Sequence, residues 1–227
     1  MPATSLFRPK DRLIGLLIIV LTFIASLGLA WWSGEQVRPK ESLPPAPPTK
    51  QGLKGFPSVD PVEVLSQARK LTERTMLRGF VAEGVSRDGK VNLSSPAIRV
   101  RYAFQGAPGQ GAQPARPRGK LPRRHYCGRQ NVHLKKSGLV ADPDQTKTLC
   151  PKKHEDPLPD PQCGTKKVWD RAVKRGASPK TLARIEYYRS RVGPAWRFTQ
   201  PGTPHRFSLY GDCERELSVK EAAGLVP

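Results

Sequence analysis

The four cysteines of this chain are the residues whose chemistry depends most directly on their spacing. Cys127, Cys150 and Cys163 lie in one region, and Cys213 follows near the C-terminus. An even number of cysteines is typical of disulfides when a chain is exported, and four cysteines can pair in three ways. We favour Cys127 with Cys150, which would cross-link a loop. The second pair, Cys163 with Cys213, would join the start of a helix to the last strand.

A zinc site is the alternative use of the same side chains. The candidate ligands are His125, Cys127, His133, Cys150, His154 and Cys163. Structural zinc sites usually contain closely spaced pairs such as Cys-x-x-Cys, and the sequence has none. An oxidising compartment also favours disulfides over thiolate ligands. We therefore expect no metal and no cofactor.

Residues that could form a catalytic site are sparse. The sequence contains no Gly-x-Ser-x-Gly elbow, His-Glu-x-x-His motif, Walker loop or dinucleotide-binding fingerprint. Glu155, Asp156 and Asp160 stand among prolines, which is typical of an exposed turn. A cysteine nucleophile would need a free Cys127 near His125, whereas the even cysteine count favours a disulfide. We expect no enzyme, with an exported hydrolase or peptidoglycan-processing enzyme as the alternative.

An excess of basic residues is the second chemical feature. The chain has 39 basic and 19 acidic residues, for a formal charge of +20. Residues 89–141 include eleven basic residues and no acidic one. The candidate polyanion-binding residues are Arg116, Arg118, Lys120, Arg123, Arg124, Arg129, Lys135 and Lys136. Such a surface attracts an anionic glycan, an anionic lipid or an acidic protein partner, and extracellular nucleic acid is a further alternative.

An apolar segment, residues 13–32, precedes the basic region and predicts contact with a membrane. It carries no charge, and Arg8, Lys10 and Arg12 stand just before it. A helix of this length, rising about 1.5 Å per residue, spans the hydrocarbon core of a bilayer. A cleavable signal peptide is the alternative, although its apolar stretch is usually shorter. We favour a single-pass signal anchor with residues 1–12 in the cytoplasm and the C-terminal domain in the periplasm or outside the cell.

A proline-rich linker is predicted at residues 33–59. Its central sequence, Pro-Pro-Ala-Pro-Pro, favours extended polyproline II structure over a packed core. The exported domain then covers residues 60–217, and residues 218–227 form a C-terminal tail. The long connection at residues 106–165 is a basic insertion that contains three of the cysteines.

The first half of the exported domain predicts one helix followed by strands. The helix begins at residues 60–63, Asp-Pro-Val-Glu, which supply an N-cap, a proline at the first helical position and an acidic residue in the first turn. Strand patterns follow at residues 80–85, 91–93 and 98–105. An Asp-Gly hairpin signal lies between the first two strands.

The same order of elements is predicted a second time near the C-terminus. Residues 167–175 have helical periodicity, and Gly176 is well placed to end the helix. Residues 182–188, 195–199 and 205–210 are rich in residues that favour strands. The exported domain is therefore predicted to contain two units, each with one helix followed by three strands.

The predicted fold class is α+β, with an N-terminal transmembrane helix. The two units would form an antiparallel sheet with the helices packed on one face. This order of elements, over residues 60–104 and 167–213, resembles the cystatin-like and PepSY-like modules of exported bacterial proteins. The resemblance implies a noncatalytic binding, inhibitory or chaperone-like domain. Together with the charge, it favours a membrane-tethered binding or structural module with a basic surface.

Overall fold

The computed structural model describes residue 53 and residues 55–111, 125–150 and 157–225. The predicted N-tail, the predicted transmembrane segment at 13–32 and most of the proline-rich linker lie outside these residues. Within them, no helix combines the length and the apolar composition that crossing a membrane requires.

The described part of the chain folds into ten strands and three helices. In chain order they are β1 (Ser58–Val59), α2 (Pro61–Lys70), β2 (Met76–Val85), β3 (Val91–Asn92), β4 (Arg99–Gln105), β5 (Arg129–Lys135), β6 (Gly138–Ala141), α3 (Thr165–Lys174), β7 (Ala183–Ser190), β8 (Gly193–Thr199), β9 (Arg206–Tyr210), α4 (Val219–Ala222) and β10 (Gly224–Leu225).

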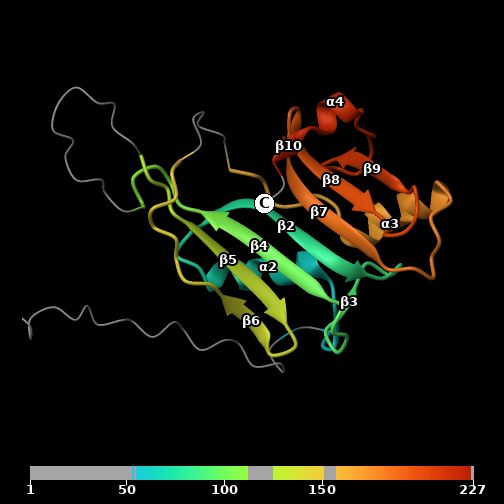
Figure 1. Cartoon of the computed structure of the whole chain (residues 1–227), viewed down its shortest axis with the longest axis horizontal. Coiled ribbons are helices and arrows are strands. Elements are labelled where there is room, and N and C mark those ends of the chain that lie inside the picture. The colour runs from blue at the N-terminus through green and yellow to red at the C-terminus, as the bar shows by residue number, and fades with distance from the viewer. Residues whose placement is uncertain (1–52, 54, 112–124, 151–156, 226–227) are drawn as a thin grey trace, which may run out of the picture. The chain divides into compact units, whose positions relative to one another are not determined.

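All the strands belong to one antiparallel sheet, whose main path is β6-β5-β4-β2-β7-β8-β9 (Figure 1). The two longest strands, β2 and β7, lie side by side at its centre, where Phe80 pairs with Tyr187. The short strands β1 and β3 pair with each other beside the end of β2, and β10 pairs with β7. The sheet is therefore continuous from the first half of the domain to the second.

The α+β class predicted from the sequence is wrong, because the described chain is mostly β. The helices α2 and α3 have ten residues each and α4 has four, whereas ten strands form one continuous sheet. The insertion at 106–165 contributes to this difference, since it contains β5 and β6, which extend the sheet beyond β4.

The start of α2 matches the local chemistry of its sequence. The Asp60 side chain accepts a hydrogen bond of 2.8 Å from the Val62 amide, which satisfies one of the unpaired donors of the first turn. The next residue, Pro61, has no amide hydrogen to satisfy. Val64, Leu65 and Ala68 share the buried face of this helix. The helix is therefore anchored by its cap and by one apolar stripe.

The helix α3 is anchored chiefly by an aromatic residue. Its N-cap, Gly164, makes no side-chain capping bond. Trp169 is fully buried, packs edge-on against Phe198 with ring centroids 4.9 Å apart, and donates from Nε1 to the Val85 carbonyl at 3.2 Å. Burial of such a side chain contributes on the order of 2–3 kcal/mol. The packing of Trp169 thus compensates for the missing cap.

A small hydrophobic cluster contains Tyr188, Ala195 and Leu217. The main hydrophobic core lies between the sheet and the helices α2 and α3, which Figure 1 shows behind the strands. The fully buried rings of Phe80, Tyr102, Tyr187 and Trp196 form its centre, with neighbouring centroids 4.8–6.0 Å apart. Tyr102 donates its hydroxyl to the Pro61 carbonyl at 2.7 Å. Burial raises the pKa of Tyr102, so this hydroxyl stays protonated and remains a donor.

The structure contains two disulfides, Cys127–Cys150 and Cys163–Cys213, and no described cysteine is free. The prediction of disulfides is confirmed, and the cysteines pair as favoured from the sequence. The Cα atoms are 4.9 Å apart in the first pair and 6.3 Å apart in the second. The first disulfide closes the loop that leads into and out of β5 and β6, and the second joins the residues before α3 to those after β9.

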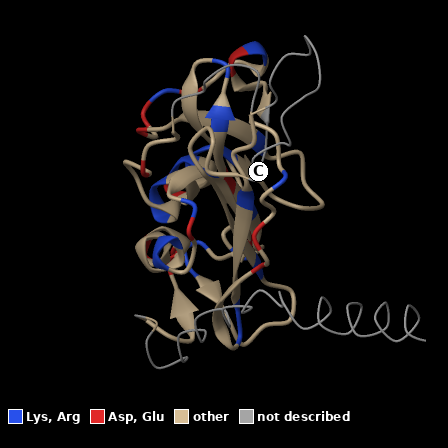
Figure 2. Cartoon of the chain, turned by 90° about the vertical axis from the view of Figure 1, so that its left-hand side faces the viewer, with Lys and Arg blue, Asp and Glu red and all other residues tan. Residues whose placement is uncertain are grey.

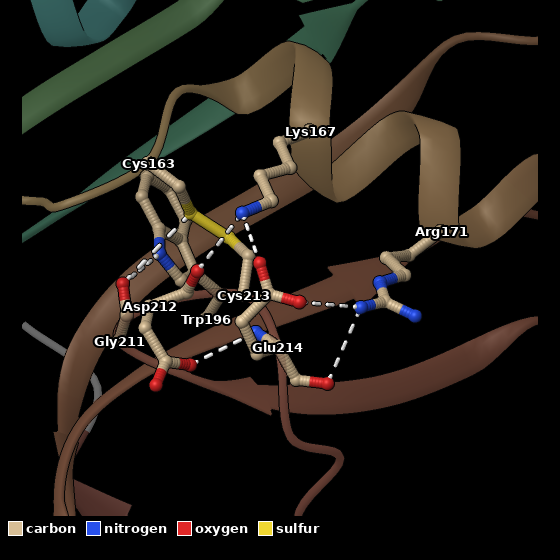
Figure 3. Close-up of a disulfide and its surroundings, with 8 residues drawn as sticks. All are labelled: Cys163, Lys167, Arg171, Trp196, Gly211, Asp212, Cys213 and Glu214. Carbon is tan, nitrogen blue, oxygen red and sulfur yellow. Dashed lines mark hydrogen bonds and ion pairs between the residues drawn. A yellow bond between two sulfur atoms is a disulfide. The ribbon is translucent and has the colours of Figure 1, made fainter.

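Figure 3 shows how the Cys163–Cys213 disulfide is embedded. Trp196 lies beside it and donates from Nε1 to the Gly211 carbonyl at 3.2 Å. Lys167 and Arg171 extend from α3 to the carboxylate of Glu214. The helix is thus attached to the segment after β9 by a covalent bond and by two ion pairs.

Candidate functional site

The sheet face opposite α2 and α3 carries the polar side chains of the strands. Because side chains alternate along a strand, burial of Phe80 and Tyr102 on the helix side places their neighbours on this open face. One row across the sheet contains His133, Arg101, Val81, Glu186 and Arg197, each opposite the next on the adjacent strand. Lys and Arg occur on the strands as well as on the helices (Figure 2).

A groove of about 400 Å³ lies on this open face. Strands β2, β4, β5 and β7 contribute to it, together with Ile98 just before β4. Its lining residues are Val81, Glu83, Ile98, Arg99, Val100, Arg101, His133, Leu134, Lys135 and Arg184. The groove therefore has an apolar floor and a rim with four basic residues, one histidine and the carboxylate of Glu83.

Gly84 positions the apolar floor of the groove. Its φ of +80° is a backbone conformation that side chains with a Cβ rarely adopt. A Cβ at this position would stand 2.8 Å from Cγ1 of Ile98, which is closer than carbon atoms can pack. The pairing of β2 with β7 also shifts register between Glu83 and Val85, as expected for a bulge. The glycine thus lets Ile98 lie directly against β2.

The β7 side of the groove is neutralised by ion pairs. Arg184 contacts Glu83 at 2.9 Å and Glu186 at 2.6 Å, and Glu186 also contacts Arg197 at 3.2 Å. The Glu186 side chain is only 6% exposed, so its two arginines compensate for the loss of water around a buried carboxylate. His133 is likewise paired with Asp142 at 2.9 Å. These groups stabilise the sheet and add little net charge to the groove.

The β4–β5 side of the groove keeps a net positive charge. Arg99 and Lys135 are exposed, and in the described part of the chain no carboxylate lies within ion-pair distance of either. Glu83 is the cross-strand neighbour of Arg99, but its nearest cation is Arg184. An anion that enters the groove would therefore meet two cations that lack a protein counter-ion.

Arg129 extends the positive region along β5. Its pKa is lowered by burial first, and then by the charges of Arg101 and Arg78. The lowered pKa therefore reflects burial first and the proximity of two other arginines second. The Arg129 Nε atom is buried and has no hydrogen-bond partner within the described residues. Arg129 is thus a half-buried cation with one donor that the described chain does not use.

A second hollow, of about 290 Å³, adjoins the groove. Ile98, Leu134 and Lys135 line both. The remaining lining residues of the second hollow are Leu93, Ser94, Ser95, Pro96 and Lys136. Lys136 is exposed and, within the described ranges, has no carboxylate in ion-pair distance. The two hollows therefore adjoin at Ile98, Leu134 and Lys135, and together they are called the depression.

Two of the predicted polyanion-binding residues line this depression, and a third is on the same strand as one of them. Lys135 lines both hollows, Lys136 lines the second, and Arg129 is on the same strand as Lys135. The other five lie outside the described residues and are Arg116, Arg118, Lys120, Arg123 and Arg124. The sequence analysis did not select Arg99, Arg101 or Arg184. In the sequence, these arginines alternate with apolar residues along two predicted strands. This alternation could have indicated that they share the polar face of a sheet.

The candidate zinc and nucleophile residues have other roles in the structure. Cys127, Cys150 and Cys163 are in disulfides, so none of these sulfurs is a thiolate. Asp160 is exposed and paired with Arg69 of α2. Tyr126 forms an isolated bridge with Leu149 beside the first disulfide. His154, Glu155 and Asp156 lie outside the described residues.

Comparison with known proteins returned no match: no family model, curated protein or solved structure is similar to this chain. The resemblance to cystatin-like or PepSY-like modules therefore stays a prediction. The function has to be inferred from the open face of the sheet.

Proposed function

We propose that this protein is a membrane-tethered, non-catalytic binding module that acts outside the cytosol and holds an anionic ligand on the open face of its sheet. The observation that carries the proposal is the groove beside Arg99 and Lys135. Two exposed cations without a described counter-ion flank an apolar floor there. An anionic component of the cell envelope, or an acidic partner protein, would supply the missing charge.

The extracytoplasmic part of the proposal is supported by the two disulfides, because such bonds persist in oxidising compartments. The tether is the uncharged segment at 13–32, with residues 1–12 on the cytoplasmic side. The linker at 33–59 would separate the domain from the bilayer. Export thus explains both the cysteine pairing and the apolar segment.

Binding is favoured over catalysis by the exposed cations of the groove. Arg99 and Lys135 have no carboxylate within ion-pair distance among the described residues, and such cations are suited to hold a negative charge in place. Glu83, the carboxylate that lines the groove, is itself paired with Arg184.

The test measures retention of the full chain, in neutral detergent, on an immobilised polyanion as salt is raised. Arg99→Ala and Lys135→Ala should each elute at lower salt than the wild type, since each removes one contact from the groove. Matched controls are Arg206→Ala and Lys180→Ala, which remove the same charge at exposed positions elsewhere. If the controls and the groove variants elute together, the binding is diffuse and the proposed site is wrong.

A further inference from the structure

The shape of the depression narrows the class of ligand, if the proposed anion-binding function holds. The groove and the second hollow share Ile98, Leu134 and Lys135. Arg99 and Arg101 line only the groove, and Lys136 lines only the second hollow. Cations are thus distributed along an extended path, and this distribution fits a ligand that carries several negative charges along its length.

The second hollow adds hydroxyl groups to the path. Ser94 and Ser95 line it beside Lys136. The Ser95 hydroxyl oxygen accepts a hydrogen bond of 3.4 Å from the Ala97 amide, which leaves its own proton available for donation. Ser94 is exposed, and its amide is satisfied by Asn92 at 3.0 Å. Such groups match the hydroxyls of a sugar, which both donate and accept.

The lining of the depression argues against two other polyanions. Among the described residues, neither hollow is lined by Phe, Tyr or Trp, and the single imidazole, His133, is held by Asp142, so successive nucleobases have no series of rings on which to stack. The apolar floor is limited to a few aliphatic side chains between charged rims. An anionic bilayer is a broad, flat surface, so a protein binds it through an exposed face and not through a hollow. A narrow path of spaced cations and hydroxyls favours a flexible, hydrophilic chain.

We propose that the depression is a two-subsite binding site for a segment of acidic polysaccharide. In the first subsite, Arg99 and Arg101 contact one acidic group of the chain. In the second subsite, Lys136 contacts another acidic group, and Ser94 and Ser95 contact sugar hydroxyls. Lys135 lies between the subsites and contacts whichever acidic group is nearer. Ile98, which is partly exposed and lines both hollows, supports the sugar ring that connects the two charges.

The experiment titrates the full chain in neutral detergent with oligogalacturonates of one to eight sugars, and with neutral maltooligosaccharides of the same lengths. Once an oligogalacturonate is long enough to span both subsites, the Kd should fall by roughly tenfold, because the second contact becomes intramolecular. Arg99→Ala should weaken binding at every length. Lys136→Ala should weaken only the longer ligands, and Arg206→Ala should change neither.

The outcomes distinguish failure of the proposed polysaccharide site from failure of the anion-binding function on which it rests. Equal affinity for all lengths of oligogalacturonate, or equal affinity for the neutral series, would overturn the two-subsite polysaccharide site. Groove-dependent binding to phosphatidylglycerol vesicles or to single-stranded DNA, without binding to the oligogalacturonates, would overturn the ligand class but leave an anion-binding groove in place. If Arg99→Ala changes binding to none of these anions, both proposals are wrong.

Discussion

Gly84 and Ile98 are in such close contact that a single added carbon at Gly84 would stand 2.8 Å from Cγ1 of Ile98. Ile98 lines both hollows, so this contact joins the backbone of β2 to the shape of the proposed binding site. The bulge that contains Gly84 is therefore in direct contact with a residue of the proposed binding site.

The first prediction separates this steric contact from backbone strain. Gly84→Ala should lower the free energy of unfolding by about 1–3 kcal/mol and weaken anion binding, because Ile98 must move. Gly202→Ala is the matched control, since Gly202 has a similar φ of +74° but no atom within 4 Å of an added Cβ. Urea unfolding and ligand titration of both variants check the prediction. If Gly84→Ala and Gly202→Ala weaken anion binding equally, displacement of Ile98 is not the cause.

The second prediction concerns Arg74, which holds the disulfide-closed loop against the start of β2. Its side chain is 6% exposed, pairs with Asp144, and donates to the Gln110 carbonyl at 2.6 Å. Arg74→Ala leaves the Asp144 carboxylate partly buried without its partner and should cost about 3–5 kcal/mol of unfolding free energy.

The control for Arg74 is the exposed ion pair between Arg69 and Asp160. These side chains are 33% and 60% exposed, so Arg69→Ala should cost less than about 1 kcal/mol. Urea unfolding followed by tryptophan fluorescence measures both variants. A similar loss for Arg69 and Arg74 would mean that burial does not govern the strength of these pairs.

The third prediction compares the two disulfides. Replacing Cys163 and Cys213 with serine opens a loop with a sequence separation of 50, whereas replacing Cys127 and Cys150 opens one of 23. Chain entropy in the unfolded state then predicts losses of about 4 and about 3 kcal/mol, respectively. Thermal and urea unfolding of the two double variants measure the losses. A larger loss for the shorter loop would show that local packing outweighs chain entropy.

The fourth prediction is a pH dependence of the C-terminal segment. The hydrogen bond from Arg215, followed by those from Ser218, lowers the pKa of Glu221 to about 2 from an ordinary value of 4.5. The depressed pKa means that these contacts stabilise the fold fully above pH 4.5 and that their contribution is lost as the pH falls towards about 2.

Hydrogen exchange at the Arg191 amide reports this change, because that amide donates to the carbonyls of Glu221 and Ala223. Exchange relative to a reference amide in β2 should accelerate between pH 4.5 and about 2. Glu221→Gln should exchange faster at neutral pH and lose this dependence. An unchanged profile in the variant would assign the effect to another group.

Local features of the fold could be predicted from the sequence, and features that depend on register could not. The start of α2 is confirmed, because the Asp60 cap uses an amide only two residues away. In contrast, β5 and β6 lie in the segment predicted as an insertion. Their apolar residues, such as Val132 and Leu134, are too few to reveal strands until β4 supplies a partner.

The candidate site likewise combines residues that the sequence identifies with residues that only the strand pairing brings together. Lys135 and Lys136 belong to a run of basic residues that composition alone identifies. Arg99 and Arg184 come from strands that are far apart in sequence, and only the pairing of β2 with both β4 and β7 brings them to one groove. The role of Gly84 depends on a bulge, which the alternating pattern of β2 does not show.

The central pairing of β2 with β7 has a consequence for biogenesis. Phe80 pairs with Tyr187, so β2 lacks one of its two neighbours until residues 183–190 have been synthesised. A chain that is incomplete at this point presents a ten-residue strand that is able to join a neighbouring copy. Synthesis of the second half of the sheet therefore closes an edge that the first half leaves open.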